Sequence, residues 1–208
     1  MDISREEAQR SLDEVQDTVE RTRKMVAYAG GDALFVVWGV IWVLGYLGSQ
    51  FLPIVRLDDF FLPLASWLWP VLVCAGIVIS VIVGKRSFPV TGPESARIGR
   101  RIGALWGLLY LYFNVWIGLL WPFIKVQGAA ESQMFSRHMG AIAGTVPMFA
   151  YVVMGLWLGN FMIWIGLAVT ALTVLGLFLF PAYFSLWMAL AGGGTLIGTG
   201  VVIRKRWR

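Results

Sequence analysis

Three stretches of the sequence share one outline, in which a Trp starts an apolar run and a Pro ends it 15 to 17 residues later. The stretches are residues 38–53, 106–122 and 164–181, and large apolar side chains precede each Pro. At a rise of about 1.5 Å per residue, a helix of this length covers most of a hydrocarbon core of roughly 30 Å. Each stretch therefore predicts a helix that crosses a membrane.

A second apolar run follows each Pro and returns to a Gly or to a basic cluster. The pattern predicts six crossings, at about residues 33–52, 61–84, 102–122, 139–158, 161–180 and 183–203. Because each pair goes out and comes back, we expect three tandem hairpins, at residues 33–86, 101–160 and 161–206. Residues 85–101 and 123–138 are expected to be the two long connections.

The composition supports a membrane protein. Apolar residues make up 58% of the 208 residues and charged residues only 14%, and the mean hydropathy is +0.73; both lie outside the range of ordinary soluble domains. We therefore predict an all-α integral membrane protein with a transmembrane domain at residues 33–206. A polar segment, residues 1–29, precedes that domain.

The polar segment predicts an amphipathic helix. Ser4 and Glu7 match the pattern in which a helix-starting Ser and a Glu three residues later cap each other's backbone amides. Small and apolar residues then recur every three or four positions, with Leu12, Val15 and Val19 at the centre of the stripe. Two interpretations stay open. Residues 4–26 bind a protein partner or a second copy as a coiled coil, or the helix lies on the cytoplasmic headgroups or against the loops of the bundle itself.

The positive charges predict the orientation. With the N-terminus inside, the inner segments hold 14 Lys and Arg and the outer segments hold three, Arg56, Lys125 and Arg137. Cytoplasmic segments carry such an excess of bases, so both termini are expected in the cytoplasm of a bacterium, with the chain in its inner membrane. Asp32, after Gly30 and Gly31, is expected to cap the first crossing.

Groups that could carry chemistry are few. No Asp, Glu, Lys, Arg or His lies in the interior of a predicted crossing, which argues against ion-coupled transport. His138 is the single histidine and Cys74 the single cysteine, so neither a metal site nor a disulfide is expected. We expect no catalytic residue and no cofactor.

Mild polar residues enter the spans and are candidates for a cavity that holds a small uncharged ligand. We single out Asn114, Tyr110, Tyr151 and Thr170, although such groups also bond across helices or to their own helix. Glycines four residues apart recur, as at Gly103 and Gly107 or Gly155 and Gly159, and favour a tightly packed bundle over an open pore.

These features lead to two hypotheses. The first is a non-enzymatic inner-membrane anchor, scaffold or accessory subunit that acts through its N-terminal helix. The alternative is a facilitator or channel-like transporter for a small neutral or apolar solute. Membrane lipids are expected partners, with anionic lipids at the basic flanks, whereas nucleic acid is not expected because the bases flank the spans and form no separate module.

Overall fold

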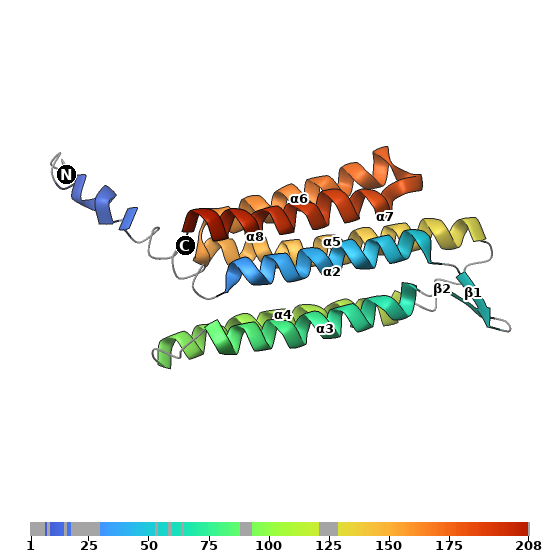
Figure 1. The fold of residues 1–208 in the computed structure, drawn as a ribbon, viewed down its shortest axis with the longest axis horizontal. Helices are drawn as coiled ribbons and strands as arrows, with labels where there is room; N and C mark the ends of the chain where they lie inside the picture. Colours follow the sequence, from blue (N-terminus) through green and yellow to red (C-terminus); the bar gives the residue numbers. More distant parts are fainter. Residues whose placement is uncertain are drawn as a thin grey trace.

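The computed structural model describes residues 7, 9–14, 16–17, 30–52, 54–57, 60–63, 65–87, 93–120 and 129–207. The described residues between 7 and 17 are helical and lie apart from the other helices, beyond the end of the molecule that holds the C-terminus (Figure 1). The long helices run side by side along the long axis (Figure 1).

The elements follow in chain order. They are α2 (Gly31–Phe51), β1 (Ile54–Leu57), β2 (Phe60–Pro63), α3 (Ala65–Ser87), α4 (Pro93–Leu120), α5 (Ala129–Leu158), α6 (Asn160–Leu179), η2 (Pro181–Tyr183), α7 (Phe184–Trp187), η3 (Met188–Gly193) and α8 (Gly194–Trp207). The last four join into one span, and η3 is a π-helical segment near its middle.

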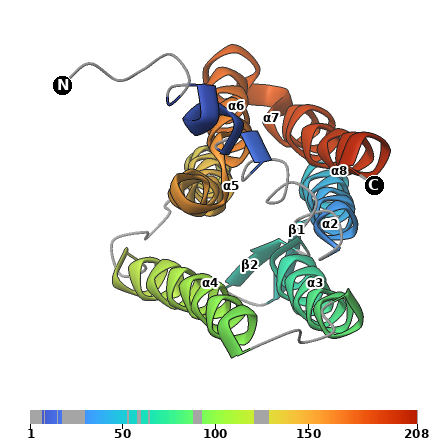
Figure 2. The same ribbon diagram turned by 90° about the vertical axis from the view of Figure 1, so that its left-hand side faces the viewer.

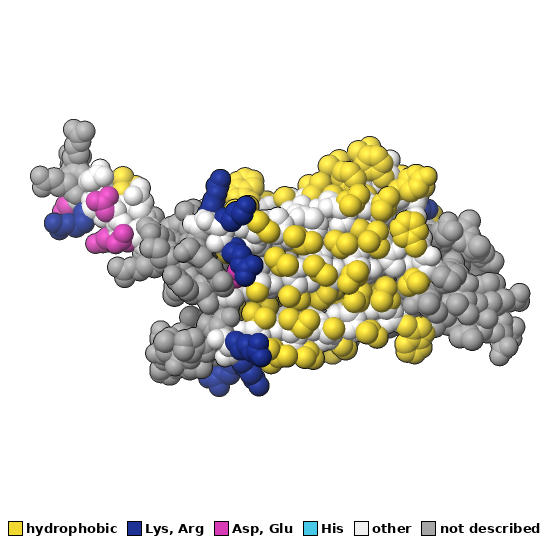
Figure 3. All heavy atoms as spheres, in the orientation of Figure 1, with side chains coloured by type: hydrophobic (Ala, Val, Ile, Leu, Met, Phe, Trp, Pro, Cys, Tyr) yellow, Lys and Arg dark blue, Asp and Glu magenta, His cyan; other side chains and the backbone are white. Residues whose placement is uncertain are grey.

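The prediction of a helical multi-pass membrane protein is confirmed. Among the described residues, five helices are long and apolar enough to cross a membrane: Gly31–Phe51, Trp67–Arg86, Arg137–Leu156, Asn160–Leu179 and Pro181–Arg206. Helices suit this environment because they satisfy their own backbone hydrogen bonds where no water is present. Apolar side chains form a broad band across the face of the bundle that Figure 3 shows.

The prolines mark helix ends as expected. Helices α2, α4 and α6 end at Phe51, Leu120 and Leu179, and in each case a Pro lies two positions further on. Proline removes an amide donor and disfavours helical conformation in the residue before it. The Trp-to-Pro outline therefore located three helix ends correctly.

The expected start of the second crossing, at residue 61, is wrong. Strands β1 and β2 pair as an antiparallel hairpin, with Ile54 opposite Pro63 and Leu57 opposite Phe60, and α3 begins only at Ala65. A run of four apolar residues such as Phe60–Pro63 is too short for its periodicity to distinguish strand from helix.

Two other expectations about helix starts also need correction. Part of the expected connection at residues 123–138 is helical, because α5 begins at Ala129. The N-cap of α2 is Gly30, whose φ of 79° is left-handed, and no side chain caps it. Asp32 instead lies within the first turn, near the positive end of the helix dipole.

The helices divide into two groups by their packing. We call α2, α5, α6 and the run from α7 to α8 the core helices, since they supply the buried cluster that includes Tyr46, Met148, Val169 and Met188. Helices α3 and α4, which we call the peripheral pair, lie on one side of them (Figure 2). Helix α3 packs on α2, and α4 packs on α5.

The closest helix pairs are α5 with α6 and α2 with α8. Each joins a helix of one expected hairpin to a helix of another, so the first and last spans of the described chain are neighbours. The division into three equivalent hairpins accordingly stays a prediction.

Candidate functional site

Tyr46 lies at the centre of the core helices. Its side chain is 3% exposed, and its hydroxyl donates a 2.9 Å hydrogen bond to the carbonyl oxygen of Gly140 on α5. Its ring meets Trp42, Trp69 and Phe184 edge to face, at centroid distances of 5.0 to 6.3 Å. Aromatic pairs favour this geometry. The ring contacts join α2 to α3 and α7, and the hydrogen bond joins α2 to α5.

Glycines bring helix backbones into direct contact. A Cβ atom placed on Gly39 would lie 2.9 Å from the carbonyl oxygen of Gly193, and a Cβ on Gly193 would lie 3.0 Å from that of Gly39. Helices α5 and α6 meet in the same way, because a Cβ on Gly166 would be 2.7 Å from the carbonyl oxygen of Met148. Close backbone approach of this kind is the main source of helix association where lipid removes the hydrophobic driving force.

Three half-buried tryptophans donate hydrogen bonds through their indole nitrogens. Trp38 Nε1 donates to Ser80 Oγ at 3.1 Å, and Trp69 Nε1 donates to Ser49 Oγ at 2.9 Å. On the other side of the bundle, Trp187 Nε1 donates to the carbonyl oxygen of Leu172 at 2.8 Å. Among the side chains that the structure describes, no buried nitrogen or oxygen lacks a partner, so this part of the interior is a closed hydrogen-bonded core.

The four residues singled out for a polar cavity lie on three helices. Asn114 is exposed on α4 and donates to the carbonyl oxygen of Tyr110 on its own helix at 2.8 Å, while Tyr110 is itself 52% exposed. Tyr151 on α5 is half-buried, and its ring lies 5.4 Å from that of Phe35 and 5.8 Å from that of Trp106. Thr170 is half-buried on α6. Beyond the bond between Asn114 and Tyr110, the described contacts place no hydrogen bond or ring pair among these four residues.

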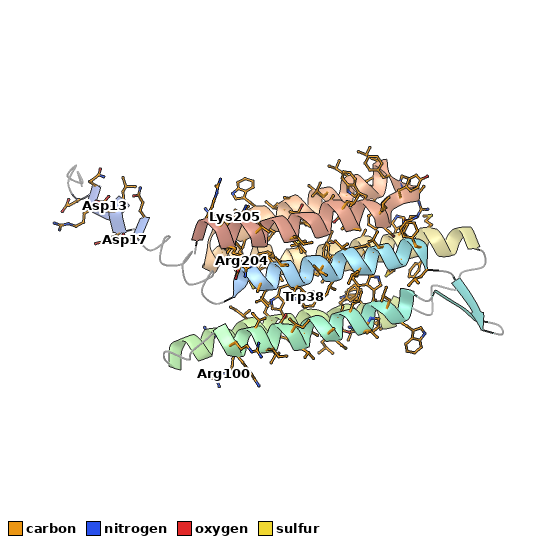
Figure 4. The ribbon with its side chains drawn as sticks, viewed as in Figure 1. Asp13, Asp17, Trp38, Arg100, Arg204 and Lys205 are labelled. Atoms are coloured by element: carbon orange, nitrogen blue, oxygen red, sulfur yellow. The ribbon has the colours of Figure 1, made fainter. Side chains whose placement is uncertain are left out.

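The stripe of the N-terminal helix is described only in part. Leu12 is 57% exposed, and Ser11 Oγ donates to the carbonyl oxygen of Glu7 at 2.9 Å, as in a regular helix. Val15, Val19 and the expected cap at Ser4 lie outside the described residues. Asp13 and Asp17 extend from this helix, away from the bundle (Figure 4).

Sequence reasoning missed an ion pair between the first and the last span. Arg204 Nε lies 3.5 Å from Asp32 Oδ2, and the Asp32 side chain is only 3% exposed, against 72% for Arg204. A Cβ on Gly200 would be 2.6 Å from the carbonyl oxygen of Asp32, so a bare backbone lets α8 approach this turn. The signal available in the sequence was an acid at the start of the first span and a base at the end of the last one.

Basic side chains gather at one end of the apolar band (Figure 3). At that end the described bases are Lys85, Arg86, Arg100, Arg101, Arg204, Lys205 and Arg206, all of them exposed. Arg100, Arg204 and Lys205 are labelled there (Figure 4). Arg137 lies in the first turns of α5, and this helix starts at the opposite end of the bundle (Figure 1). This division matches the charge asymmetry from which the orientation was predicted.

His138 is exposed near the start of α5, and its Nδ1 donates to the carbonyl oxygen of Met134 at 2.7 Å. In the described part of the chain, no three His, Cys, Asp or Glu side chains come together in a way that could hold a metal ion. Comparison with protein-family models, with curated proteins and with solved structures finds no match to this chain.

Proposed function

We propose that the protein is a non-enzymatic membrane anchor or scaffold whose N-terminal helix binds a cytoplasmic protein partner or a second copy of the chain. The observation that carries this proposal is the exposed Leu12 on a helix that lies clear of the bundle (Figure 1). A large apolar side chain held in water favours association, because burying it against another protein removes apolar surface from water.

Charge favours a protein partner over the membrane surface. The described part of the N-terminal helix, within residues 7–17, holds four acids, Glu7, Asp13, Glu14 and Asp17, and one base, Arg10. The cytoplasmic leaflet carries a negative surface potential that attracts basic segments and repels acidic ones. A helix of this charge is therefore poorly suited to lie on anionic headgroups.

The proposal assigns the remaining helices to membrane anchoring. In this proposal α4, a helix of 28 residues, also crosses the membrane and brings the number of crossings from five to six. Both termini are cytoplasmic, and the membrane is a bacterial inner membrane. The bases at one end of the apolar band support this orientation. The core helices support an anchoring role because their centre is filled by side chains such as Met148, Val169 and Met188, which are at most 1% exposed.

The decisive experiment compares two variants of the full chain. Leu12→Asp with Val19→Asp places two charges in the stripe, and we expect the purified protein to lose its second copy or its co-purifying partner. Light scattering on the detergent-solubilised protein and analysis of co-purifying proteins would measure the change.

The matched control is Arg10→Gln with Arg21→Gln, which lowers the net charge of the same segment by the same two units on the face opposite the stripe, since an α-helix turns about 100° per residue. We expect the control to behave as the natural protein does. If both variants keep the size and partners of the natural protein, the anchor proposal is wrong. A control that fails together with the stripe variant would show that charge, and not the stripe, governs association.

The alternative of a solute facilitator needs an open path lined by polar groups. Tyr110 and Asn114 are exposed on α4, and the described core has its polar groups bonded within the protein. These observations give that alternative no support.

A further inference from the structure

We propose that the basic end of the peripheral pair is a binding surface for the phosphates of anionic lipids. Lys85 and Arg86 close α3, and Arg100 and Arg101 lie two turns into α4. We call these four residues the α3–α4 corner. All four side chains are exposed, and Lys and Arg gather over the ends of these two helices at the border of the apolar band (Figure 3).

The depth of the corner suits a headgroup. The α3 span runs from Trp67 to Arg86, which is 20 residues and about 30 Å of helix, close to the thickness of the hydrocarbon core. With Trp67 at one interface, Lys85 and Arg86 reach the headgroup level at the other. Trp is a common residue at such interfaces.

The balance of charge at the corner is strongly positive. Residues 85–101 contain five bases and one acid, Glu94. The α8 end differs, because the Asp32 carboxylate lies beside Arg204 and offsets one of its charges. Two helices separated by five residues thus place four exposed bases at the same end of the peripheral pair, and phosphate oxygens are good partners for Lys and Arg.

The corner also lies where lipid has access. Only 6% of the residues in the α3 span are buried, and Ile77, Val78 and Val81 are 46% to 57% exposed. Acyl chains can therefore cover the apolar side of α3 while the phosphate contacts the bases. A soluble phosphate would lack this second contact, so the surface is assigned to a lipid.

This inference is independent of the proposed anchor function, because none of the corner residues belongs to the N-terminal helix. The test uses the full chain purified in neutral detergent and titrated with phosphatidylglycerol or with phosphatidylcholine of the same acyl chains. Native mass spectrometry counts the bound lipids. We expect several-fold more phosphatidylglycerol than phosphatidylcholine on the natural protein.

The variant Lys85→Gln, Arg86→Gln, Arg100→Gln, Arg101→Gln should lose most of this preference. The control Lys205→Gln with Arg206→Gln, at the same end of the bundle, should keep most of it. Equal binding of the two lipids by the natural protein would overturn the proposal. So would an equal loss in the control, which would indicate a diffuse effect of all bases.

Two measurements on the natural protein keep the test independent of how well the variants fold. Raising the salt concentration from about 0.1 M to about 1 M shortens the screening length from about 10 Å to about 3 Å and should reduce the preference for phosphatidylglycerol. A preference that salt does not change would contradict a charge-based site. Glycerol phosphate added at the same concentration as the lipid should not displace it, and displacement would show that the surface binds soluble phosphate.

Discussion

Val169 on α6 and Val78 on α3 are valines in two equally apolar helices, yet Val169 is fully buried and Val78 is 57% exposed. The contrast extends beyond single residues: in an apolar window of 18 residues, 39% of the residues are buried in the last span, against 6% in the α3 span. Because lipid tails are as apolar as Val or Leu, hydrophobicity does not decide which helix packs inside. In the core helices, close glycine contacts and bonded aromatic side chains make that difference.

The largest expected effect separates two glycines. Gly39→Ala should destabilise the protein strongly, by about 3 kcal/mol or more, because the new Cβ meets backbone atoms of α8 at 2.9 Å. Gly107→Ala on α4 should be close to neutral, since no atom lies within 4 Å of its Cβ position. Thermal unfolding of the two purified variants in one detergent would measure the difference. Equal destabilisation would remove the distinction between core helices and peripheral pair.

A smaller effect is expected from the two valines. Val169→Ala leaves a cavity among fully buried neighbours and should cost about 1–2 kcal/mol. Val78→Ala exchanges one lipid contact for another and should change the unfolding temperature little. The same thermal assay applies, and a costly Val78→Ala would indicate that α3 has a protein neighbour on its exposed side.

Two arginines of α8 sharpen the comparison at the end of the core. Arg204→Gln should destabilise by about 1 kcal/mol, because it leaves the buried Asp32 without this partner while Arg204 itself is well solvated. Arg206→Gln removes the same charge from the same exposed turn and should have no measurable effect. Raising the salt concentration should narrow the difference between the two variants. An identical response of both would mean that the ion pair contributes nothing.

The smallest effect concerns a hydroxyl group. Tyr46→Phe removes one buried hydrogen bond to the carbonyl oxygen of Gly140 and should cost about 0.5–1.5 kcal/mol. Tyr112→Phe, on the peripheral pair, is the control because its side chain is 63% exposed. Chemical unfolding in mixed micelles should resolve the two. If Tyr112→Phe proves the more costly change, Tyr112 must be covered in the membrane by a second protein molecule, since it is exposed in a single copy of the chain.

The positions of the helices in the sequence were easier to predict than the contacts between them. Apolar runs that end at Pro locate the ends of α2, α4 and α6, because proline acts on the chain locally. Which helices touch is not a local property. Gly39 contacts Gly193, which is far from it in the sequence, and no pattern in the sequence pairs the two glycines. The hairpin at residues 54–63 was missed because a four-residue apolar run has too little periodicity.

The candidate sites were predictable to a smaller extent. Leu12 is exposed on a helix, and its role in binding a partner stays a prediction, since the two valines of its stripe lie outside the described residues. Asn114 and Tyr110 are candidates for a cavity because mild polar groups in a span can hold a small uncharged ligand, but the Asn114 amide donates to a carbonyl oxygen of its own helix. The contact of Asp32 with Arg204 joins residues 172 positions apart, a separation at which charge alone identifies no pair.

The π-helical segment Met188–Gly193 makes the number of residues in the last span matter, as well as their types. A turn closed by bonds five residues apart takes up one residue more than an α-helical turn, and each residue of an α-helix rotates the chain by about 100°. Winding the same residues as a regular α-helix would add the rotation of one residue and turn Gly200 and Arg204 about a quarter of a circle away from α2. The π-helical segment in the middle of the span thus sets the rotation of α8 about its axis, and that rotation decides which side chains of α8 face α2.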